Sequence, residues 1–516
     1  MRADHAVRCM LVPGHLSLPT MSDALPVHVV WFVRDLRLCD HAPLTEALKA
    51  DGLVLPLYIV DPARTGAEDY AARYWHFVRP CLQELRHRLQ QRGAPLIVRQ
   101  GPAVEVLADL HERFPRMTVW RHYETETADV RARDARVREW CRAGGVPLHE
   151  RFHRGAFPGL ESRDDWSDRW EERMAQPLIP SPDQIRAVAD LPPGPLPTVE
   201  DLPLRDEGLD PDQMQAPGEG AAHRCLQDFL HRRAVHYRAS ISSPARTFDN
   251  CSRLSPHLTW GTLSLKTVRH MLRERQQALQ AQPAGGDWQR ALQAFESRLY
   301  WNGHFIQKLD DAPRIQHESY IPAFDDTRAG EVNDAHLQAW RTGQTGYPMV
   351  DASIRAFRAT GYLNFRMRAM ITSFASYDLW LDWRRFAPIM ARWMLDYEPG
   401  IHYPQVQMQS GTTGINTMRI YNPSKQVRDH DPDGTFIRRW VPELRPLPKG
   451  YLAEPWKTPP LVQEEVDWRI GEDYPMPVVE HLPAVRKARE RLAAIRKHPA
   501  VQAAAARVLK KHGSRR

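Results

Sequence analysis

The 516-residue sequence lacks the features that mark several common classes of protein. It has no run of 18 apolar residues, so we expect no membrane-spanning segment and a cytoplasmic location. Its six cysteines have no paired spacing, which fits a reducing compartment. None of them lies beyond Cys251, so we expect no iron–sulfur cluster in the second half of the chain.

Other signatures are missing as well. The chain has no Gly-x-Gly-x-x-Gly turn, no phosphate loop and no nucleophile elbow. Its His, Cys and Asp residues show no metal-ligand spacing, so we expect no metal site. The first 24 residues have no signal-peptide pattern, and we interpret them as an N-terminal extension that begins at either Met1 or Met21.

The overall composition is that of a soluble globular protein. Hydrophobic residues make up 42% of the chain and charged residues 26%. The formal net charge of +7 and the pI of about 9.1 weakly favour a polyanionic partner. Sixteen tryptophans are unusual. Core packing explains most of them, and stacking on a flat ligand or on bases is the alternative.

The first part of the chain alternates strand and helix patterns. Short apolar runs at Val27–Val33 and Leu53–Val60 are typical of buried parallel strands, and His41–Ala50 between them has helical spacing. The further predicted elements are helices at 70–91, 104–114 and 128–141 and strands at 96–99, 117–122 and 146–151. This alternation predicts an α/β domain with a doubly wound parallel sheet over residues 25–155.

The second part of the chain is predicted to be all α. Ten prolines from Pro177 to Pro217 disfavour helix there, so we place a linker at residues 156–218. Helical patterns at 221–234, 263–280, 291–308, 352–360 and 365–380 predict a larger helical domain over residues 219–483. Residues 484–516 form a basic, helical tail, for which a solvated terminal helix is favoured over a nucleic-acid contact.

Two groups of residues in the helical part could carry chemistry, and each also has an ordinary structural explanation. Ser252 and Ser255, downstream of Tyr237, could present hydroxyls to a phosphate at a helix start, although Ser255 is also a normal helix cap. A buried arginine needs a carboxylate, so we predict an ion pair between Arg368 and Asp396. Without other context, a purely structural salt bridge is the favoured explanation of that pair.

Taken in order, these stretches resemble the photolyase/cryptochrome family of flavoproteins, from about Val27 to His481. The first domain opens with W-F-V-R-D-L-R at Trp31–Arg37, which is similar to the family's opening with the first arginine displaced. The matching stretches of the second domain are Ser252–Leu258, Thr345–Ala352, Arg419–Pro423, Phe436–Leu444 and Tyr474–His481. By this resemblance the chain is identified as a member of that family.

The resemblance implies a non-covalent FAD, folded into a U-shape inside the helical domain. The residues that it assigns to FAD are Tyr237, Cys251, Ser252, Arg253, Leu254, Ser255, Arg368, Asp396, Tyr397 and Glu398. Residues 237 and 251–255 would hold the phosphates, whereas Asp396 and Glu398 would hold the isoalloxazine–ribose side, with Arg368 beside the ring. Family members often hold an antenna chromophore in the first domain. Its identity stays open here because the antenna residues do not align.

In repair enzymes of the family, the reduced flavin absorbs blue light and donates an electron to a pyrimidine dimer flipped out of DNA. The residues that the resemblance assigns to DNA are Arg298, Trp301, Phe365, Arg366, Met408 and Arg419. Catalytic roles would fall to Trp301 as a stacking platform, to Trp383 as the middle member of an electron relay, and to His402 facing N5 of the flavin.

Several positions depart from the family's repair pocket. Val406 and Met408 stand where an electron-relay tryptophan and a dimer-stacking tryptophan are expected. Arg298 and Phe365 replace a lesion-contacting glutamate and its asparagine partner, and His402 replaces an asparagine. We therefore expect an altered lesion pocket and an altered electron relay.

Three functions stay open at this point. The first is a light-driven deoxyribodipyrimidine photo-lyase that acts as a monomer on damaged DNA, supported by Trp301, Arg366, Arg419 and the basic charge balance. The second is a blue-light photoreceptor without repair activity, supported by the altered pocket and His402. The short chain beyond the family match weighs against a long signalling extension. The third, a nucleic-acid binder that keeps FAD only structurally, is least favoured.

Overall fold

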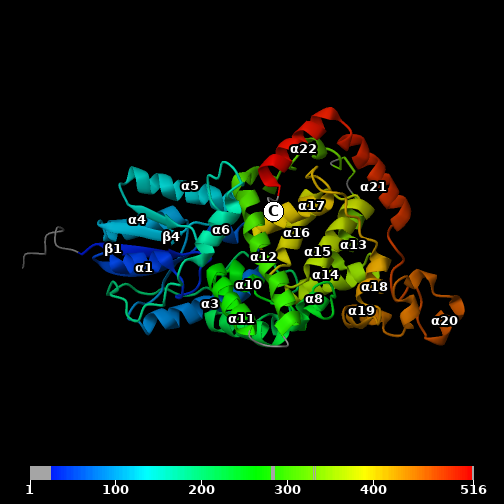
Figure 1. The fold of residues 1–516 in the computed structure, drawn as a ribbon, viewed down its shortest axis with the longest axis horizontal. Coiled ribbons are helices and arrows are strands. Elements are labelled where there is room, and N and C mark those ends of the chain that lie inside the picture. The colour runs from blue at the N-terminus through cyan, green and yellow to red at the C-terminus, as the bar shows by residue number, and fades with distance from the viewer. Residues whose placement is uncertain (1–24, 281–284, 329, 332, 514–516) are drawn as a thin grey trace, which may run out of the picture.

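The computed structural model describes residues 25–280, 285–328, 330–331 and 333–513. An α/β part lies at one end of an elongated molecule, and a larger helical part occupies the rest (Figure 1). The N-terminal extension predicted for residues 1–24 lies outside the described residues.

Five parallel strands form the sheet of the α/β part. They are β1 (Val27–Phe32), β2 (Leu53–Val60), β3 (Ile97–Gln100), β4 (Met117–His122) and β5 (Leu148–Arg151). Their spatial order is β3-β2-β1-β4-β5, and the register aligns Val27 of β1 with Leu53 of β2 and Met117 of β4. The direction of winding reverses at β1, which is the doubly wound topology that the sequence predicts.

Helices cover both faces of the sheet, which explains why its central strands are unbroken apolar runs. The covering helices are α1 (Ala42–Lys49), α3 (Ala72–Gln90), α4 (Ala103–Arg113) and α5 (Ala128–Ala143). Val30 and Phe32 of β1 belong to the apolar cluster of α1 and α3, whereas Val29 and Trp31 belong to that of α4 and α5. Successive β1 side chains therefore face opposite layers, as the period of a strand requires.

The helical part is organised around the long helix α12 (Gly285–Asp311), which packs along α17 (Pro399–Ser410). Its other helices are α7 (Glu219–Asp228), α8 (Tyr237–Ser240), α9 (Thr247–Asn250), α10 (Ser255–Thr259), α11 (Leu265–Gln280), α13 (Asp334–Thr342), α14 (Pro348–Thr360), α15 (Phe365–Ser373), α16 (Trp383–Arg392), α18 (Pro423–His430), α19 (Thr435–Trp440) and α20 (Pro460–Glu465). The predicted fold class, an α/β domain followed by a larger all-α domain, is confirmed. None of the helices described is both long and apolar enough to cross a bilayer.

Two elements of the helical part differ from the expected pattern. The helix predicted over residues 365–380 leaves the α form after Ser373 and continues as a π-helical turn, Phe374–Asp378. The sequence pattern does not predict α17, because its prolines and polar side chains hide the apolar period. Pro399 lies in its first turn, where a missing N–H leaves no bond unmade, and Gly411 ends it with a φ of 78°.

The segment between the two parts contains local structure of its own. Helix α6 (Trp166–Ala175) lies within residues 156–218, and a β-bridge joins Ala187 of this segment to Val54 of β2. The segment therefore contacts the sheet before the chain enters the helical part. The domain limits derived from the sequence stay predictions.

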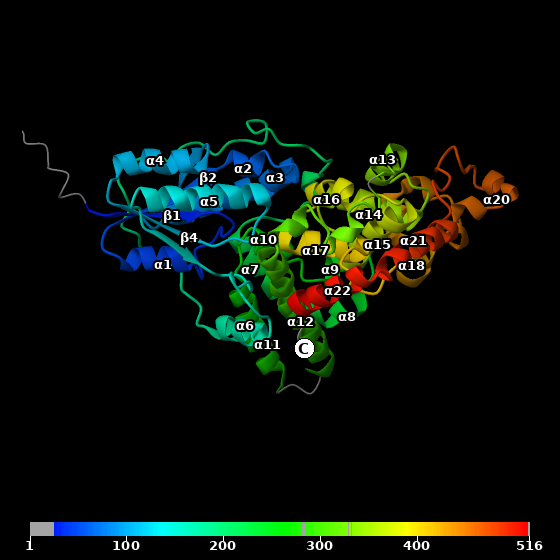
Figure 2. The same cartoon turned by 90° about the horizontal axis from the view of Figure 1, so that it is seen from above.

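Two C-terminal helices, α21 (His481–Arg496) and α22 (Pro499–His512), pack back onto the helical part (Figure 2). Leu492 and Val501 are buried in one apolar cluster with Tyr377 of the π-helical turn. The basic tail is therefore helical, as its sequence predicts, and it buries one face against the domain.

Candidate functional site

An arginine–aspartate pair lies at the centre of the helical part. Arg368, on α15, donates from Nη2 to Oδ2 of Asp396 across 2.9 Å and from Nε to the Leu363 carbonyl across 2.7 Å. The two chain segments approach closely at Gly361, where φ is 71° and a Cβ would lie 2.4 Å from the Leu395 side chain. The ion pair predicted from the sequence is therefore present, and the local backbone fixes its position.

Several buried polar atoms around this pair have no hydrogen-bond partner in the described part of the chain. They are Oδ1 of Asp396, Nδ1 of His402, Oδ1 of Asn364 and Nη1 of Arg253. The charge of Asp396 acts on both His402 and Arg253, which places these groups near one another. An unpaired buried polar atom costs about 1–3 kcal/mol, so this grouping is typical of a site built for a polar ligand.

His402 presents a neutral imidazole to this site. Its Nε2 donates to the Ala387 carbonyl across 2.9 Å, which leaves Nδ1 as the hydrogen-bond acceptor. Burial lowers the pKa of His402 to about 4, because an imidazolium there would lose its solvation. At neutral pH the side chain therefore offers an acceptor to an N–H donor of a ligand.

The loop between α9 and α10 brings Cys251 close to Tyr237, and Leu254 belongs to the same apolar cluster. Arg253 has a φ of 58°, and its guanidinium carbon lies 3.7 Å from the centroid of the Tyr362 ring. Burial lowers the pKa of Arg253, and no carboxylate pairs with it in the described part of the chain. A buried guanidinium without a carboxylate suits an anionic ligand. Leu254 packs into an apolar cluster, so it can offer a ligand only its backbone.

Glu398 belongs to a different group, an ionic cluster where the α/β and helical parts meet. Its carboxylate contacts Arg34 Nη2 at 3.1 Å and Arg154 Nη1, and it accepts the Gly400 N–H at 3.4 Å as the N-cap of α17. These donors occupy both of its oxygens. The expected place of Glu398 beside the isoalloxazine or the ribose stays a prediction.

This ionic cluster contains three carboxylates and three guanidinium groups. Arg34 also contacts Glu124 at 3.3 Å and Glu126 at 2.8 Å, and Arg64 contacts Glu126 at 2.7 Å. Burial on its own would lower the pKa of Arg34, but the charges of Glu126, Glu398 and Glu124 outweigh burial and raise it. Arg34 therefore stays charged and joins the two parts of the molecule.

The Tyr397 side chain contacts the α/β part of the molecule. Its hydroxyl donates to the carboxylate of Asp69 in the α/β part, and its ring stacks on Tyr74 with 5.9 Å between centroids. The assignment of Tyr397 to the cofactor likewise stays a prediction.

The apolar side chains predicted to meet DNA, those of Trp301, Phe365 and Met408, are exposed or half-buried. Phe365, the first residue of α15, is 50% exposed. Trp301 on α12 and Met408 on α17 are half-buried, and both helices pack together in the same layer. The ring of Trp301 lies 5.8 Å from that of Phe305, one helical turn further along α12.

The arginines predicted to meet DNA share one property. Arg298 and Arg419 are exposed and Arg366 is partly buried, and none of the three forms an ion pair with a carboxylate in the described part of the chain. Arg298 lies beside the Tyr237 hydroxyl. Guanidinium groups that no carboxylate neutralises are available to phosphates.

Trp383, the predicted relay residue, is buried at the start of α16. Its Nε1 donates to Ser319 Oγ across 3.3 Å, and its ring centroid lies 6.4 Å from that of Tyr403. Val406, also buried, occupies the position where a relay tryptophan is expected. The aromatic neighbour of Trp383 in the described part of the chain is therefore a tyrosine.

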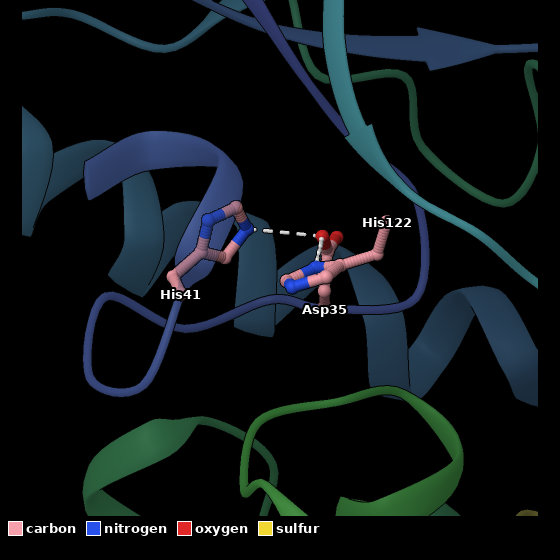
Figure 3. A group of neighbouring side chains, drawn as sticks. All are labelled: Asp35, His41 and His122. Atoms are coloured by element: carbon pink, nitrogen blue, oxygen red, sulfur yellow. Dashed lines mark hydrogen bonds and ion pairs between the residues drawn. The ribbon is translucent and has the colours of Figure 1, made fainter. Parts of the chain in front are cut away.

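The fold also gathers Asp35, His41 and His122, which show no metal-ligand spacing in the sequence. Figure 3 shows both imidazoles aimed at one carboxylate: Oδ2 of Asp35 accepts from His41 Nε2 at 2.9 Å and from His122 Nδ1 at 2.6 Å. His41 Nδ1 accepts the Leu44 N–H at 3.1 Å, so Nε2 must carry the proton and has no lone pair for a metal. These hydrogen bonds make the group a structural link between β1, α1 and β4.

Sequence reasoning did not single out four residues that matter here, namely Tyr362, Asn364, Asp69 and Arg154. Tyr362 and Asn364 lie in G-Y-L-N-F, directly before α15, and a polar residue between apolar ones is the signal that could have found Asn364. Asp69 and Arg154 have no local signal, because their partners come from the other part of the molecule.

Comparisons with known proteins cover both parts of the chain. Residues 28–158 match the family model described as DNA photolyase, and residues 295–494 match the one described as the FAD binding domain of DNA photolyase. A deoxyribodipyrimidine photo-lyase of Salmonella typhimurium is 30% identical over 482 residues, which cover 89% of this chain and 96% of that protein.

Two further relatives carry different names. The cryptochrome DASH of Gloeobacter violaceus is 28% identical over 475 residues, covering 88% of this chain and 93% of that protein. The crystal structure of a class III photolyase from Agrobacterium tumefaciens matches with a TM-score of 0.78 at 26% identity, covering 93% of this chain and all of that one.

Proposed function

This chain belongs to the photolyase/cryptochrome family of FAD-binding proteins, and we propose that it uses blue light to repair UV-induced pyrimidine dimers in DNA. In this proposal it is a deoxyribodipyrimidine photo-lyase that works as a monomer in the cytoplasm. The observation that carries the repair assignment is exposed Phe365 next to Arg366 at the start of α15, because Arg366 forms no ion pair with a carboxylate in the described part of the chain.

FAD, when bound, supplies a ring that absorbs blue light and passes a single electron. In our proposal Oδ1 of Asp396 and Nδ1 of His402 accept hydrogen bonds from donors on the flavin side of the cofactor. Arg368, held by Asp396, adds positive charge beside the ring and favours its anionic reduced form. Arg253 and the hydroxyl of Tyr237 hold the phosphates, together with the backbone of residues 251–255.

In our proposal, residues on and near α15 also bind the DNA. Arg366 and Arg419 neutralise phosphates, and Trp301 and Phe365 offer flat faces on which an unstacked pyrimidine pair can lie. Flipping brings the lesion out of the base stack, because a dimer within the duplex cannot reach a buried flavin. Met408 leaves a flexible thioether where a rigid stacking ring is expected, so the pocket adapts its shape to the lesion.

The decisive experiment irradiates the purified protein, loaded with reduced FAD, together with DNA that carries one defined lesion. Separate duplexes contain a cyclobutane dimer or the other dipyrimidine photoproduct, and chromatography follows the amount of each lesion. We expect light-dependent loss of at least one lesion and none in the dark. Persistence of both lesions, with an intact flavin photoreaction, would exclude repair and leave the photoreceptor function.

Salt dependence tests the proposed DNA surface. Arg366→Gln and Arg419→Gln are each expected to reduce the slope of log K against log salt by about 0.9, because each removes one phosphate contact. Fluorescence anisotropy with UV-damaged DNA between about 50 and 200 mM salt measures this slope. Arg142→Gln is the matched control, since Arg142 is exposed on α5 and pairs with Glu139. Equal slopes for all three variants would place the DNA elsewhere.

A blue-light photoreceptor without repair activity is the second candidate function. The observation that favours it is the neutral, buried His402 beside the Arg368–Asp396 pair, at the position assigned to flavin N5. A long-lived flavin photoproduct, formed in the lesion experiment without lesion loss, is the result that would select this function.

A further inference from the structure

We propose that Asp69 accepts the phenol proton of Tyr403 when Tyr403 gives up an electron during light-driven reduction of the flavin. Tyr403 and Asp69 then form a coupled donor of one electron and one proton. This inference rests on the proposed FAD function and adds to it the source of the electron and the destination of the proton.

A single carboxylate oxygen of Asp69 receives two phenols. Oδ2 accepts from the Tyr403 hydroxyl across 3.1 Å and also from the Tyr397 hydroxyl. All three side chains are buried, with relative exposures of 5% for Asp69, 3% for Tyr403 and 7% for Tyr397. Asp69 comes from the segment before α3, whereas Tyr397 lies just before α17 and Tyr403 within it, so the contact forms only when the two parts of the molecule meet.

Asp69 has no cationic partner in the described part of the chain. Arg34 contacts Glu126, and Arg392 pairs with Glu207 at 2.6 Å, so the charges of these arginines are already balanced. Burial raises the pKa of Asp69, and the two phenol hydrogen bonds only partly offset that rise. A buried carboxylate without a counter-charge is stabilised by taking up a proton, which makes it a suitable acceptor.

Tyr403 also has the ring contacts of an electron donor. Its centroid lies 6.4 Å from that of Trp383 and 5.1 Å from that of His402, the residue assigned to the flavin. Val406, one turn further along α17, is aliphatic and cannot carry the electron. Tyr403 is therefore a redox-active ring close enough to Trp383 to return an electron to it.

The proposed step balances in electrons and protons. FAD, when bound and excited by light, would take one electron from Trp383, and Tyr403 then returns one electron to Trp383. The O–H bond of Tyr403 breaks, and its proton forms a new O–H bond at Oδ2 of Asp69. The products are a neutral tyrosyl radical, a neutral carboxylic acid at Asp69, restored Trp383 and one added electron on the cofactor.

The proton transfer is what makes this donor effective. An oxidised phenol that keeps its proton is a strong acid, so oxidation of Tyr403 in an apolar interior is unfavourable unless an acceptor lies within hydrogen-bond distance. Asp69 supplies this acceptor at 3.1 Å. For recombination, the tyrosyl radical must regain its electron and the proton must return from Asp69 to the phenol oxygen. This second requirement slows recombination.

Time-resolved absorption and electron paramagnetic resonance on the FAD-loaded protein test the pair. In the unchanged protein we expect a neutral tyrosyl radical after a light pulse, formed more slowly in D2O. Asp69→Asn and Tyr403→Phe are both expected to lose this radical. Tyr74→Phe is the control that should keep it, because the Tyr74 hydroxyl donates to the backbone carbonyls of Ala391 and Asp69 and not to the carboxylate.

Infrared difference spectroscopy gives a second readout that does not depend on repair. With labelled aspartate, light should produce the carbonyl band of a protonated carboxylic acid, and Tyr403→Phe, which keeps the carboxylate, should lack it even if Asp69→Asn fails to fold. Flavin reduction without a tyrosyl radical and without this band would refute the Tyr403–Asp69 pair alone. A protein that binds no FAD would instead refute the proposed function.

Discussion

Asp396→Asn protein is expected to lose most of its FAD during purification, with an affinity for FAD about 10- to 100-fold weaker than that of the unchanged protein. The substitution removes the charge that holds Arg368 across 2.9 Å and changes the buried Oδ1 that lacks a protein partner. Loss of a hydrogen bond to a charged group costs about 1.5–3 kcal/mol, which corresponds to that factor. Flavin absorbance per mole of protein and titration of the apoprotein with FAD measure the effect.

Asp429→Asn is the matched control for this prediction. Asp429 pairs with Lys425 at 2.8 Å on the outer face of α18, and its substitution should leave FAD binding unchanged. Full FAD content in the Asp396→Asn protein would show that the flavin does not lie at the Arg368–Asp396 pair.

Arg34→Met is expected to lower the free energy of unfolding by about 3–5 kcal/mol, the usual cost of removing one partner from a buried ionic group. Arg34 is 1% exposed and contacts Glu124, Glu126 and Glu398, so its loss leaves an excess of buried negative charge. Since whole domains are stable by about 5–15 kcal/mol, the variant should unfold at a much lower urea concentration. Urea titration monitored by circular dichroism measures this shift.

Arg142→Met provides the comparison. Arg142 also pairs with a glutamate, but both side chains are more than half exposed, so water replaces the lost contact. We expect little change in its unfolding midpoint. A similar midpoint for the two variants would mean that the ionic cluster contributes no more than an ordinary surface pair.

The α/β part was the easier part of the fold to predict, and the reason is physical. Its strands are covered on both faces, so each appears in the sequence as an uninterrupted apolar run with clear ends. The predicted limits of β2 (Leu53–Val60) and β4 (Met117–His122) agree with the structure to the residue. Helix α17 was hidden, because its burial against several neighbours leaves no single apolar stripe and two of its twelve residues are proline.

The candidate site also has contacts that the sequence could predict and contacts that it could not. The Arg368–Asp396 pair could be predicted, since two charged residues in apolar surroundings need each other. The assignment of Glu398 and Tyr397 to the cofactor stays a prediction, whereas their contacts with Arg34 and Asp69, 364 and 328 residues away in the chain, could not be predicted. Contacts at such separations depend on how the two parts of the molecule pack together, and no local sequence pattern indicates that packing.

The N-cap residue of helix α17, the helix that carries His402, contacts both the α/β part and the helical part. Glu398 caps it while Arg34 and Arg154 hold the same carboxylate, and a Cβ on Gly261 would meet the Arg34 carbonyl oxygen at 2.0 Å. The two halves are therefore not interchangeable modules. A chimera that joins this helical half to the α/β half of a distant relative would need matching changes on both sides of the junction, so the halves must vary together in evolution.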